Sequence, residues 1–302
     1  MSAMTPEVPS ALSPLVRRVV ASNPSHMTGP GTNTYLVGID EVAVIDPGPD
    51  SKAHTDAIVG AAGRDRVRWI VLTHTHSDHA PGATRLAKVT GAEVLAFSTR
   101  EKRVKVDRAI GEGATIDGTE FRLEVLHTPG HAPNHLCFHL DEERMLFTGD
   151  TILGGMYSVV SPSTGGDMAQ YFSTLERLGK MRLRSIAPGH GELIEEPRAR
   201  IDDYLQHRKA RESQILRQVR QGPSSVKSIV AALYVDTPEL LLPVAAKQIY
   251  SHLKKLREEG RVTGRDQRST WTATSLEPTH PHNLSAQVST HRPIFERSNI
   301  DL

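Results

Sequence analysis

The segment WIVLTHTHSDHAPG at residues 69–82 constrains the fold of this chain more than any other stretch. It begins with an apolar run between polar flanks, which is typical of a buried strand in a sheet interior. His74, His76, Asp78 and His79 follow directly. Alternate residues of an extended chain point to the same side, so His74 and His76 can share one ligand cluster. Asp78 and His79 come as the chain turns, and they can face a second point nearby.

Imidazole nitrogens and a carboxylate form the usual ligand set for zinc, and they also suit iron or manganese. The alternative interpretation is a solvated loop of titratable residues. The spacing H-x-H-x-D-H directly after an apolar strand favours the metal site, because chance rarely produces it. The chain has a single cysteine, Cys137, which excludes an internal disulfide and a cysteine-rich zinc site.

A related arrangement recurs further along the chain, where a short apolar strand ends in a Gly or Pro turn that carries a His or an Asp. The positions are His131, Asp150 and His190. Loops at strand ends are where rigid sheets present functional groups, so these loops can converge with residues 74–79 on one site. Asp46 also follows an apolar strand. It is either a turn-forming residue or an acceptor that orients a ligand histidine, and the sequence leaves both open.

Strand and helix patterns alternate and predict an α/β sandwich. Helical spacing predicts helices at 52–62, 83–89 and 168–179. The irregular spacing and the β-hairpins argue against a purely parallel, doubly wound sheet. Net charge is +1, which points to neither a nucleic-acid nor a membrane partner for the whole molecule.

The motifs THTHSDH, TPGH at 128–131, TGD at 148–150 and PGHG at 188–191 resemble, in order and spacing, the metal motifs of the metallo-β-lactamase superfamily. The resemblance implies a four-layer αβ/βα sandwich with a dinuclear site on one edge. It implies two divalent ions, zinc before iron or manganese, and a metal-bridged hydroxide as nucleophile. The implied ligands are His74, His76 and His131 for one ion, Asp78, His79 and His190 for the other, and Asp150 between them. Asp78 and Asp150 are also the implied catalytic carboxylates, which offset the charge of the ions and hold the hydroxide in line.

The C-terminal part of the chain forms a separate pattern. A long polar helix is predicted at 198–221, a second helix through Tyr234, a third at 243–259 with Gly260 after its end, and a basic hairpin beyond it. This order resembles a winged helix. Lys and Arg outnumber Asp and Glu by about two to one between residues 205 and 275.

The combination of both parts resembles the lactamase-β-like 2 subfamily, which includes a mitochondrial single-strand endoribonuclease. The resemblance implies single-stranded RNA as the preferred substrate, with small esters, thioesters or lactones as the alternative. A primary β-lactamase role is disfavoured, because Asp150 stands where the zinc β-lactamases commonly place a cysteine. A rival from another class is a nucleic-acid-binding protein without catalysis, for which the complete ligand set is unexpected.

Other residues near the motifs allow two interpretations. His135 is a candidate acid for the leaving group, and a structural role suits it equally. Tyr157 follows Asp150 in a Gly-rich stretch, and both substrate contact and a structural role are open. A structural role is the first interpretation for His127.

The chain is predicted to divide into a mobile segment at 1–14, a hydrolase domain at 15–205, a winged-helix-like domain at 206–275 and a disordered tail at 276–302. It shows no basic and apolar secretory signal and no apolar run long enough to span a membrane. These absences predict a cytoplasmic protein whose partner is a small-molecule or single-stranded RNA substrate and not a membrane.

Overall fold

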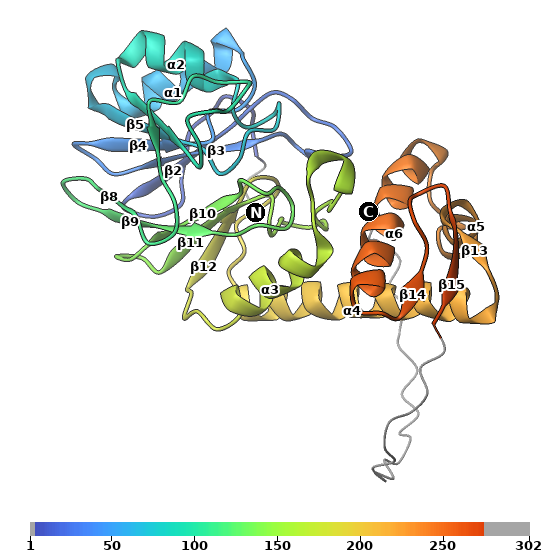
Figure 1. Cartoon of the computed structure of the whole chain (residues 1–302). Coiled ribbons are helices and arrows are strands. Elements are labelled where there is room, and N and C mark those ends of the chain that lie inside the picture. Colours follow the sequence, from blue (N-terminus) through green and yellow to red (C-terminus); the bar gives the residue numbers. More distant parts are fainter. Residues whose placement is uncertain (1–3, 275–302) are drawn as a thin grey trace. The chain divides into compact units, whose positions relative to one another are not determined.

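The computed structural model describes residues 4–274, which divide into two units. Unit 1 ends at Lys209 and unit 2 begins at Ala210, inside one long helix (Figure 1). The predicted tail at 276–302 lies outside the described residues. No helix within residues 4–274 combines the length and the apolar character that crossing a membrane requires.

The first sheet of unit 1 follows chain order from β1 to β7. Its strands are β1 (Ser10–Ala11), β2 (Val16–Val20), β3 (Asn33–Val37), β4 (Val42–Ile45), β5 (Val67–Val71), β6 (Glu93–Ala96) and β7 (Arg108–Ala109). The pairs from β1 to β4 are antiparallel, and those from β4 to β7 are parallel. The prediction that the sheet is not purely parallel is confirmed. Both β3 and β4 are buried along their whole length, because both faces of the sheet are covered.

The outer face of the first sheet is covered by α1 (Lys52–Ala62) and α2 (Gly82–Thr90), with η1 (Arg64–Arg66) leading from α1 into β5 (Figure 1). Ser51 caps α1 by accepting a hydrogen bond from the backbone N–H of His54. Ile58 and Leu86 are fully buried on the sheet-facing sides of the two helices. Both helices occur where their apolar spacing predicts them.

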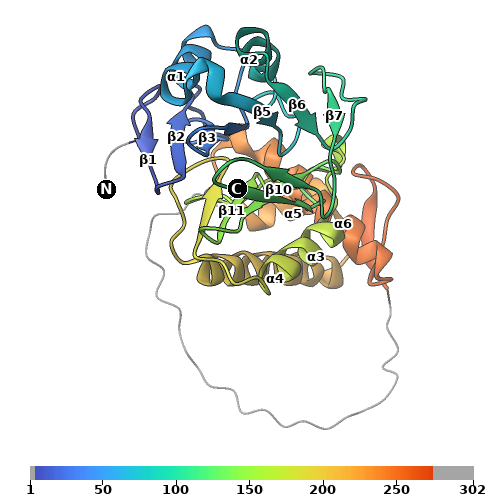
Figure 2. The same ribbon diagram turned by 90° about the vertical axis from the view of Figure 1, so that its left-hand side faces the viewer.

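The second sheet has the order β12-β11-β10-β9-β8. Its strands are β8 (Thr115–Asp117), β9 (Arg122–His127), β10 (Leu136–Leu140), β11 (Met145–Gly149) and β12 (Ser185–Pro188). Only β11 and β12 pair parallel; the other neighbours are antiparallel. Its outer face packs against α3 (Met168–Leu178), which follows η2 (Pro162–Thr164), and against the first part of α4 (Pro197–Gln221) (Figure 2). The layers therefore run helices, sheet, sheet, helices, which confirms the αβ/βα sandwich.

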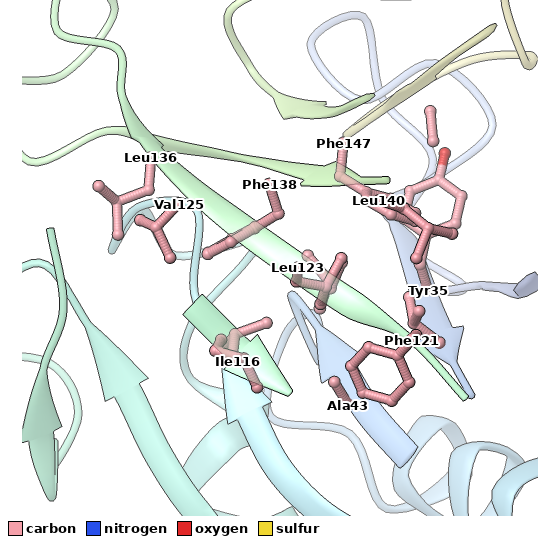
Figure 3. Packing of buried hydrophobic residues seen from close by; sticks show 14 of the residues in the cluster. Tyr35, Ala43, Ile116, Phe121, Leu123, Val125, Leu136, Phe138, Leu140 and Phe147 are labelled. Atoms are coloured by element: carbon pink, nitrogen blue, oxygen red, sulfur yellow. The ribbon is translucent and has the colours of Figure 1, made fainter. Parts of the chain in front are cut away.

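The inner faces of the two sheets enclose the main core of unit 1 (Figure 3). Leu123 and Phe138 of the second sheet and Ala43 of the first are completely buried in it. The rings of Tyr35 and Phe147 meet between the sheets, with centroids 5.1 Å apart. The Tyr35 hydroxyl donates to the carbonyl of Pro188 at 2.7 Å, so this contact also joins the sheets beside the loop after β12.

The start of the chain, predicted to be mobile, makes specific contacts from its first described residues. Strand β1 pairs with β2. The Glu7 carboxylate lies 2.6 Å from Nδ1 of the buried His54, and it also accepts a hydrogen bond from the backbone N–H of Ser22 at 3.1 Å. The Pro- and Ser-rich composition does not reveal these contacts, because they depend on a histidine that lies far along the chain.

Unit 2 consists of helices packed on a small sheet of order β13-β15-β14. Its elements after α4 are β13 (Ser224–Ser225), α5 (Val226–Leu233), η3 (Glu239–Leu241), α6 (Leu242–Glu258), β14 (Val262–Thr263) and β15 (Thr270–Ala273). Its own core contains Ile249, Leu253 and Trp271, all completely buried. Gly260 has φ +71° just after α6, as predicted for a residue that ends a helix. The hairpin β14–β15 forms the predicted wing.

Candidate metal centre

The predicted loops converge at the strand ends of unit 1. The candidate side chains form two groups, in each of which all ligand atoms lie within 4.8 Å of one another. The groups are His74, His76, His131 and Asp150, and Asp78, His79, Asp150 and His190. Each loop follows a strand, namely β5, β9, β11 or β12. The structure thus brings together all the residues that the sequence suggests as ligands, with Asp150 shared by the two groups.

In the first group, three imidazole nitrogens face one another. Nδ1 of His76 lies 3.0 Å from Nε2 of His74 and 3.0 Å from Nε2 of His131. Oδ2 of Asp150 lies 3.6 Å from Nε2 of His131. In the second group, Oδ1 of Asp150 lies 3.2 Å from Nε2 of His79.

Protein acceptors hold the most buried histidines of both groups in one orientation. The partners of their Nδ1 atoms are Thr73 Oγ1 for His74 at 3.0 Å, Asp46 Oδ2 for His79 at 2.8 Å, the Val159 carbonyl for His131 at 2.7 Å and the Gly31 carbonyl for His190 at 3.2 Å. An Nδ1–H that donates leaves the lone pair on Nε2. In their neutral form, these histidines therefore direct lone pairs, and not N–H groups, into the two groups.

The second group contains buried polar atoms without hydrogen-bond partners, namely Nε2 of His79, Nε2 of His190 and Oδ1 of Asp150. Leaving such an atom unpaired costs about 1–3 kcal/mol, so their convergence calls for a bound group. Atoms placed tetrahedrally at about 2.0–2.1 Å from zinc lie about 3.3 Å from one another. Oδ1 of Asp150 lies 3.2 Å and 3.3 Å from the two Nε2 atoms, so these residues fit a divalent metal ion.

Electrostatics favour the same interpretation. Burial lowers the pKa of His74 well below its ordinary value and lowers the pKa of His76 to about 4, and neighbouring histidines add to both shifts. Burial acts in the same direction on His79, but the carboxylates of Asp150 and Asp78 outweigh it and raise the pKa of His79 well above the ordinary value. The first group therefore offers neutral imidazoles, while the second carries negative charge that a divalent cation would offset.

Asp46 resolves the choice that the sequence leaves open, because it fills both roles. Its backbone turns the chain with φ +50°. Its carboxylate accepts hydrogen bonds from the backbone N–H of Thr73 at 2.8 Å, from the Thr73 hydroxyl at 2.6 Å and from Nδ1 of His79. Asp46 thereby orients His79 directly and His74 through Thr73.

Close backbone packing also shapes the groups. A Cβ atom on Gly189 would lie 2.8 Å from Oδ1 of Asp150 and 2.9 Å from Cε1 of His79, so any side chain there would displace both residues. The side-chain amide of Asn33 donates to the carbonyls of Pro188 and Gly191 and fixes this loop against β3. The sequence motif PGHG therefore contains glycine because the loop backbone touches the ligands.

Residues 27–190 match the family described as "Metallo-beta-lactamase superfamily", with the ligand motifs inside the match. The chain belongs to the metallo-beta-lactamase superfamily. Members of this superfamily are hydrolases, and the chain is accordingly a hydrolase of this fold. Residues 225–271 match the "Beta-lactamase associated winged helix domain", which confirms the winged helix of unit 2.

Several known proteins resemble the chain over most of its length. The Beta-lactamase-like protein 2 homolog of Drosophila melanogaster is 34% identical over 86% of this chain and 93% of its own length. An atrochrysone carboxyl ACP thioesterase of Cryptosporiopsis sp. is 29% identical over 83% of this chain and 82% of its own length. The crystal structure of a metallo-beta-lactamase family protein of Thermus thermophilus shares the fold, with a TM-score of 0.73, 24% identity, and coverage of 87% of this chain and 100% of that chain.

Many zinc β-lactamases of this superfamily use a cysteine as a metal ligand. Cys137 does not fill that role in this chain. Cys137 lies on β10 and is completely buried. Its thiol accepts a hydrogen bond from the Thr128 hydroxyl at 3.3 Å, and burial raises its pKa to about 12. It belongs to neither ligand group among the described residues.

His135 lies against the candidate ligand His74 and belongs to neither of the two groups. Its ring is completely buried and stacks on His74, with centroids 5.0 Å apart. Nε2 accepts a hydrogen bond from the backbone N–H of Asp150 at 3.2 Å, and Nδ1 lies 2.9 Å from the Thr128 hydroxyl. Both nitrogens are thus engaged inside the protein, which supports the structural role and not that of a leaving-group acid. His127, half-buried, donates from Nε2 to the Pro133 carbonyl at 3.0 Å.

Helix α4 supports the first group from behind. The completely buried guanidinium of Arg208 donates to the carbonyl of Ser158. The adjacent Val159 carbonyl is the acceptor for His131. Tyr157 donates to Asp203 at 2.8 Å and stacks on His207 at 3.7 Å, which favours its structural role. The sequence does not reveal the roles of Arg208 and Asn33, because nothing in their local patterns distinguishes them from ordinary surface or strand residues. Thr73 stands at the start of the THTHSDH motif, but its spacing does not show that it holds His74.

Proposed function

We propose that the chain is a dinuclear metal-dependent hydrolase that cleaves acyl thioesters. The observation that carries the proposal is the convergence of His and Asp side chains in two groups that share Asp150. His74, His76, His131 and Asp150 would hold one ion, and Asp78, His79, Asp150 and His190 the other. Nitrogen-rich donor sets with carboxylates suit zinc best, and iron or manganese remain the alternatives.

Divalent ions held there would polarise a substrate carbonyl and lower the pKa of bound water to about 7. The chain's own contribution is orientation and charge. Asp78 is the more exposed carboxylate of the groups, with 26% of its side chain accessible against 12% for Asp150. Burial opposes its ionisation, but His79 and His190 lower its pKa, so it faces the open side as a carboxylate that can accept a hydrogen bond from attacking water.

The choice of a thioester follows from the leaving group. His135, the sequence candidate for a leaving-group acid, is buried and uses both ring nitrogens inside the protein. A thiol has a pKa of about 8.5, so a thiolate departs at neutral pH without a strong proton donor. An alkoxide from an ester or from ribose needs one. The site is therefore better suited to thioesters than to RNA phosphodiesters or simple esters.

The comparisons give the thioester some support, since the relative from Cryptosporiopsis sp. bears the name of an acyl-carrier thioesterase. They give none to single-stranded RNA, the substrate implied by the resemblance to the lactamase-β-like 2 subfamily. The basic charge behind that expectation is partly used inside unit 2. Lys255 contacts Glu212 and Glu259 at 2.9 and 2.6 Å, and Arg257 donates to the carbonyl of Arg265 at 2.9 Å.

The test compares turnover of a short uncharged acyl thioester, a lactone, a β-lactam and single-stranded RNA by metal-analysed protein. We expect thioester turnover, and we expect His76→Ala to reduce it by more than about 100-fold with loss of bound metal. His26→Ala removes an exposed histidine far from the motifs in sequence and serves as the matched control. RNA turnover with inert thioesters would show the substrate to be wrong, and full thioester turnover by metal-free protein would exclude the metal mechanism.

A further inference from the structure

The connection between β6 and β7, residues 97–107, carries positive charge that the proposed function does not use. Arg100, Lys102 and Arg103 are exposed, and within residues 4–274 none of them has a carboxylate partner. We call these three residues the basic strip. Lys105 differs from them, because it lies 3.8 Å from Asp107. Unpaired cations held close together raise the local concentration of anionic ligands.

Glu101, in the middle of the basic strip, ties this connection to the ligand loops. Its Oε2 accepts a hydrogen bond from the Thr75 hydroxyl at 2.8 Å, and its Oε1 accepts one from the Asn134 side-chain amide at 2.9 Å. The Asn134 amide also donates to the Thr75 hydroxyl at 3.0 Å. Thr75 stands between His74 and His76. These hydrogen bonds of Glu101, which we call the tether, therefore attach the connection to the loop of the first ligand group.

The tether determines where the basic strip lies. Consecutive Cα atoms are about 3.8 Å apart, so Arg100 and Lys102 begin one residue from the anchored Glu101. On the other side, Val104 and Val106 are buried in the core beneath α2. The carboxylate of Glu101 points inward to Thr75 and Asn134, while its cationic neighbours are exposed to solvent. The connection thus presents fixed positive charge beside the ligand loops.

An exposed aromatic ring lies at the start of the same connection. Phe97 has 37% of its surface accessible, and its ring stacks on that of His127 with centroids 4.6 Å apart and an interplanar angle of 21°. His127 is held by its hydrogen bond to Pro133, next to Asn134. Aromatic rings beside cations are suited to a nucleotide, which offers a planar base and phosphate groups.

We propose that Phe97 and the basic strip bind the nucleotide part of a thioester substrate whose leaving thiol carries phosphate groups. The inference rests on the proposed thioester hydrolysis and specifies its substrate. Water adds its oxygen to the acyl carbon and gives up one proton to the solvent. The carbon–sulfur bond breaks, the acyl group leaves as a carboxylic acid, and the sulfur leaves as the thiolate of the phosphorylated carrier. The strip contacts the part of the substrate that does not react, so its binding energy acts mainly on KM.

The experiment uses the full chain and two acyl thioesters, one of coenzyme A and one of the uncharged thiol N-acetylcysteamine. The variant is R100Q/K102Q/R103Q. The matched control is R64Q/K180Q/R182Q, which removes the same charge from exposed positions of unit 1. We expect kcat/KM for the coenzyme A thioester to fall at least about tenfold in the first variant, through KM. Turnover of the uncharged thioester should stay within about twofold in both variants.

A second readout separates this inference from the proposed function. Binding of coenzyme A itself, measured by calorimetry, should weaken at least about tenfold in R100Q/K102Q/R103Q and not in the control, and it should weaken with added salt. If no thioester is hydrolysed but this binding difference holds, the proposed function fails and the subsite stands. Equal losses for both thioesters, equal binding by both variants, or binding of single-stranded RNA but not of coenzyme A would each overturn the inference.

Discussion

Asp46 combines an unfavourable backbone with a favourable set of contacts. A non-glycine residue with φ +50° costs about 1 kcal/mol or more, although Asp tolerates this region better than most residues. The conformation places one carboxylate where it accepts from Thr73 twice and from His79 once. These contacts compensate for the strain and set the orientation of His79. Asp46 itself belongs to neither candidate ligand group.

Replacing Asp46 with Asn keeps the volume and removes the charge. The amide offers one oxygen, so an N–H group would face either Thr73 or His79. We expect metal affinity to fall about 10- to 100-fold. Competition with a chelator of known affinity measures it. Asp50→Asn, which removes the exposed partner of Arg85, is the control, and equal affinities of the two variants would contradict the orienting role.

At the scale of elements, α4 shows how one buried cation supports a distant loop. Arg208 is 2% exposed, lies over the Tyr171 ring at 5.3 Å and donates to Ser158. Its helical neighbour Lys209 is exposed. The helix therefore does more than cover the second sheet, because it fixes the stretch whose next carbonyl holds His131.

We expect Arg208→Met to leave the Ser158 carbonyl without this donor and to lower the free energy of unfolding by about 1–3 kcal/mol. Metal bound by the first group should also be released more readily. Thermal unfolding and chelator competition measure the two effects, and Lys209→Met is the control. Loss of stability without any change in metal release would limit Arg208 to a packing role.

In unit 2, Glu212 links α4 to α6. Its carboxylate lies 2.9 Å from Nζ of Lys255 and 3.4 Å from Nδ1 of His252. Burial alone would raise the pKa of Glu212, but the hydrogen bonds from His252 and Lys255 lower it below the ordinary value. A carboxyl whose pKa is lower in the folded state stabilises the fold above the unfolded pKa, and this contribution disappears as pH falls through the folded pKa.

Glu212→Gln should therefore lower the unfolding temperature of the chain at about pH 7, and the difference from the unaltered protein should shrink below about pH 4. Thermal unfolding followed by circular dichroism over this pH range checks the prediction. Glu258→Gln removes an exposed carboxylate from the same helix as Lys255 and should have no such effect. A pH-independent difference would mean that the charge of Glu212 is unimportant.

For the whole molecule, each unit has its own core, and the ligand groups belong to unit 1. Divalent ions that bind the folded protein stabilise it by about 4 kcal/mol at a thousandfold excess over Kd. Chelation should therefore increase hydrogen exchange in the loops at 74–79, 128–131 and 188–191. The backbone amides of α6, which packs in the core of unit 2, should keep their protection from hydrogen exchange. Uniform loss of protection in both units would contradict independent cores.

The sequence by itself predicted the candidate ligand set and the layered fold. The residues of each motif are close in the chain, so their spacing, the apolar strand before them and the Gly turns after them are local information. Alternating helix and strand patterns likewise predicted an α/β sandwich, and the resemblance to the metallo-β-lactamase superfamily implied its αβ/βα layer order. The order of helices and a basic hairpin predicted the wing. These features depend on residues that are close together in the chain, so the sequence alone shows them.

Only the tertiary structure decided which residues support the ligands. His207, Arg208 and Lys209 are consecutive polar residues of one helix. Only Arg208 among the three is buried, because it packs against α3 and the loop at Ser158. The same holds for Glu101, which accepts hydrogen bonds from Thr75 and Asn134, and for His135, whose ring is buried with both nitrogens engaged inside the protein. Burial and long-range hydrogen bonds depend on partners far along the chain, and no local pattern records them.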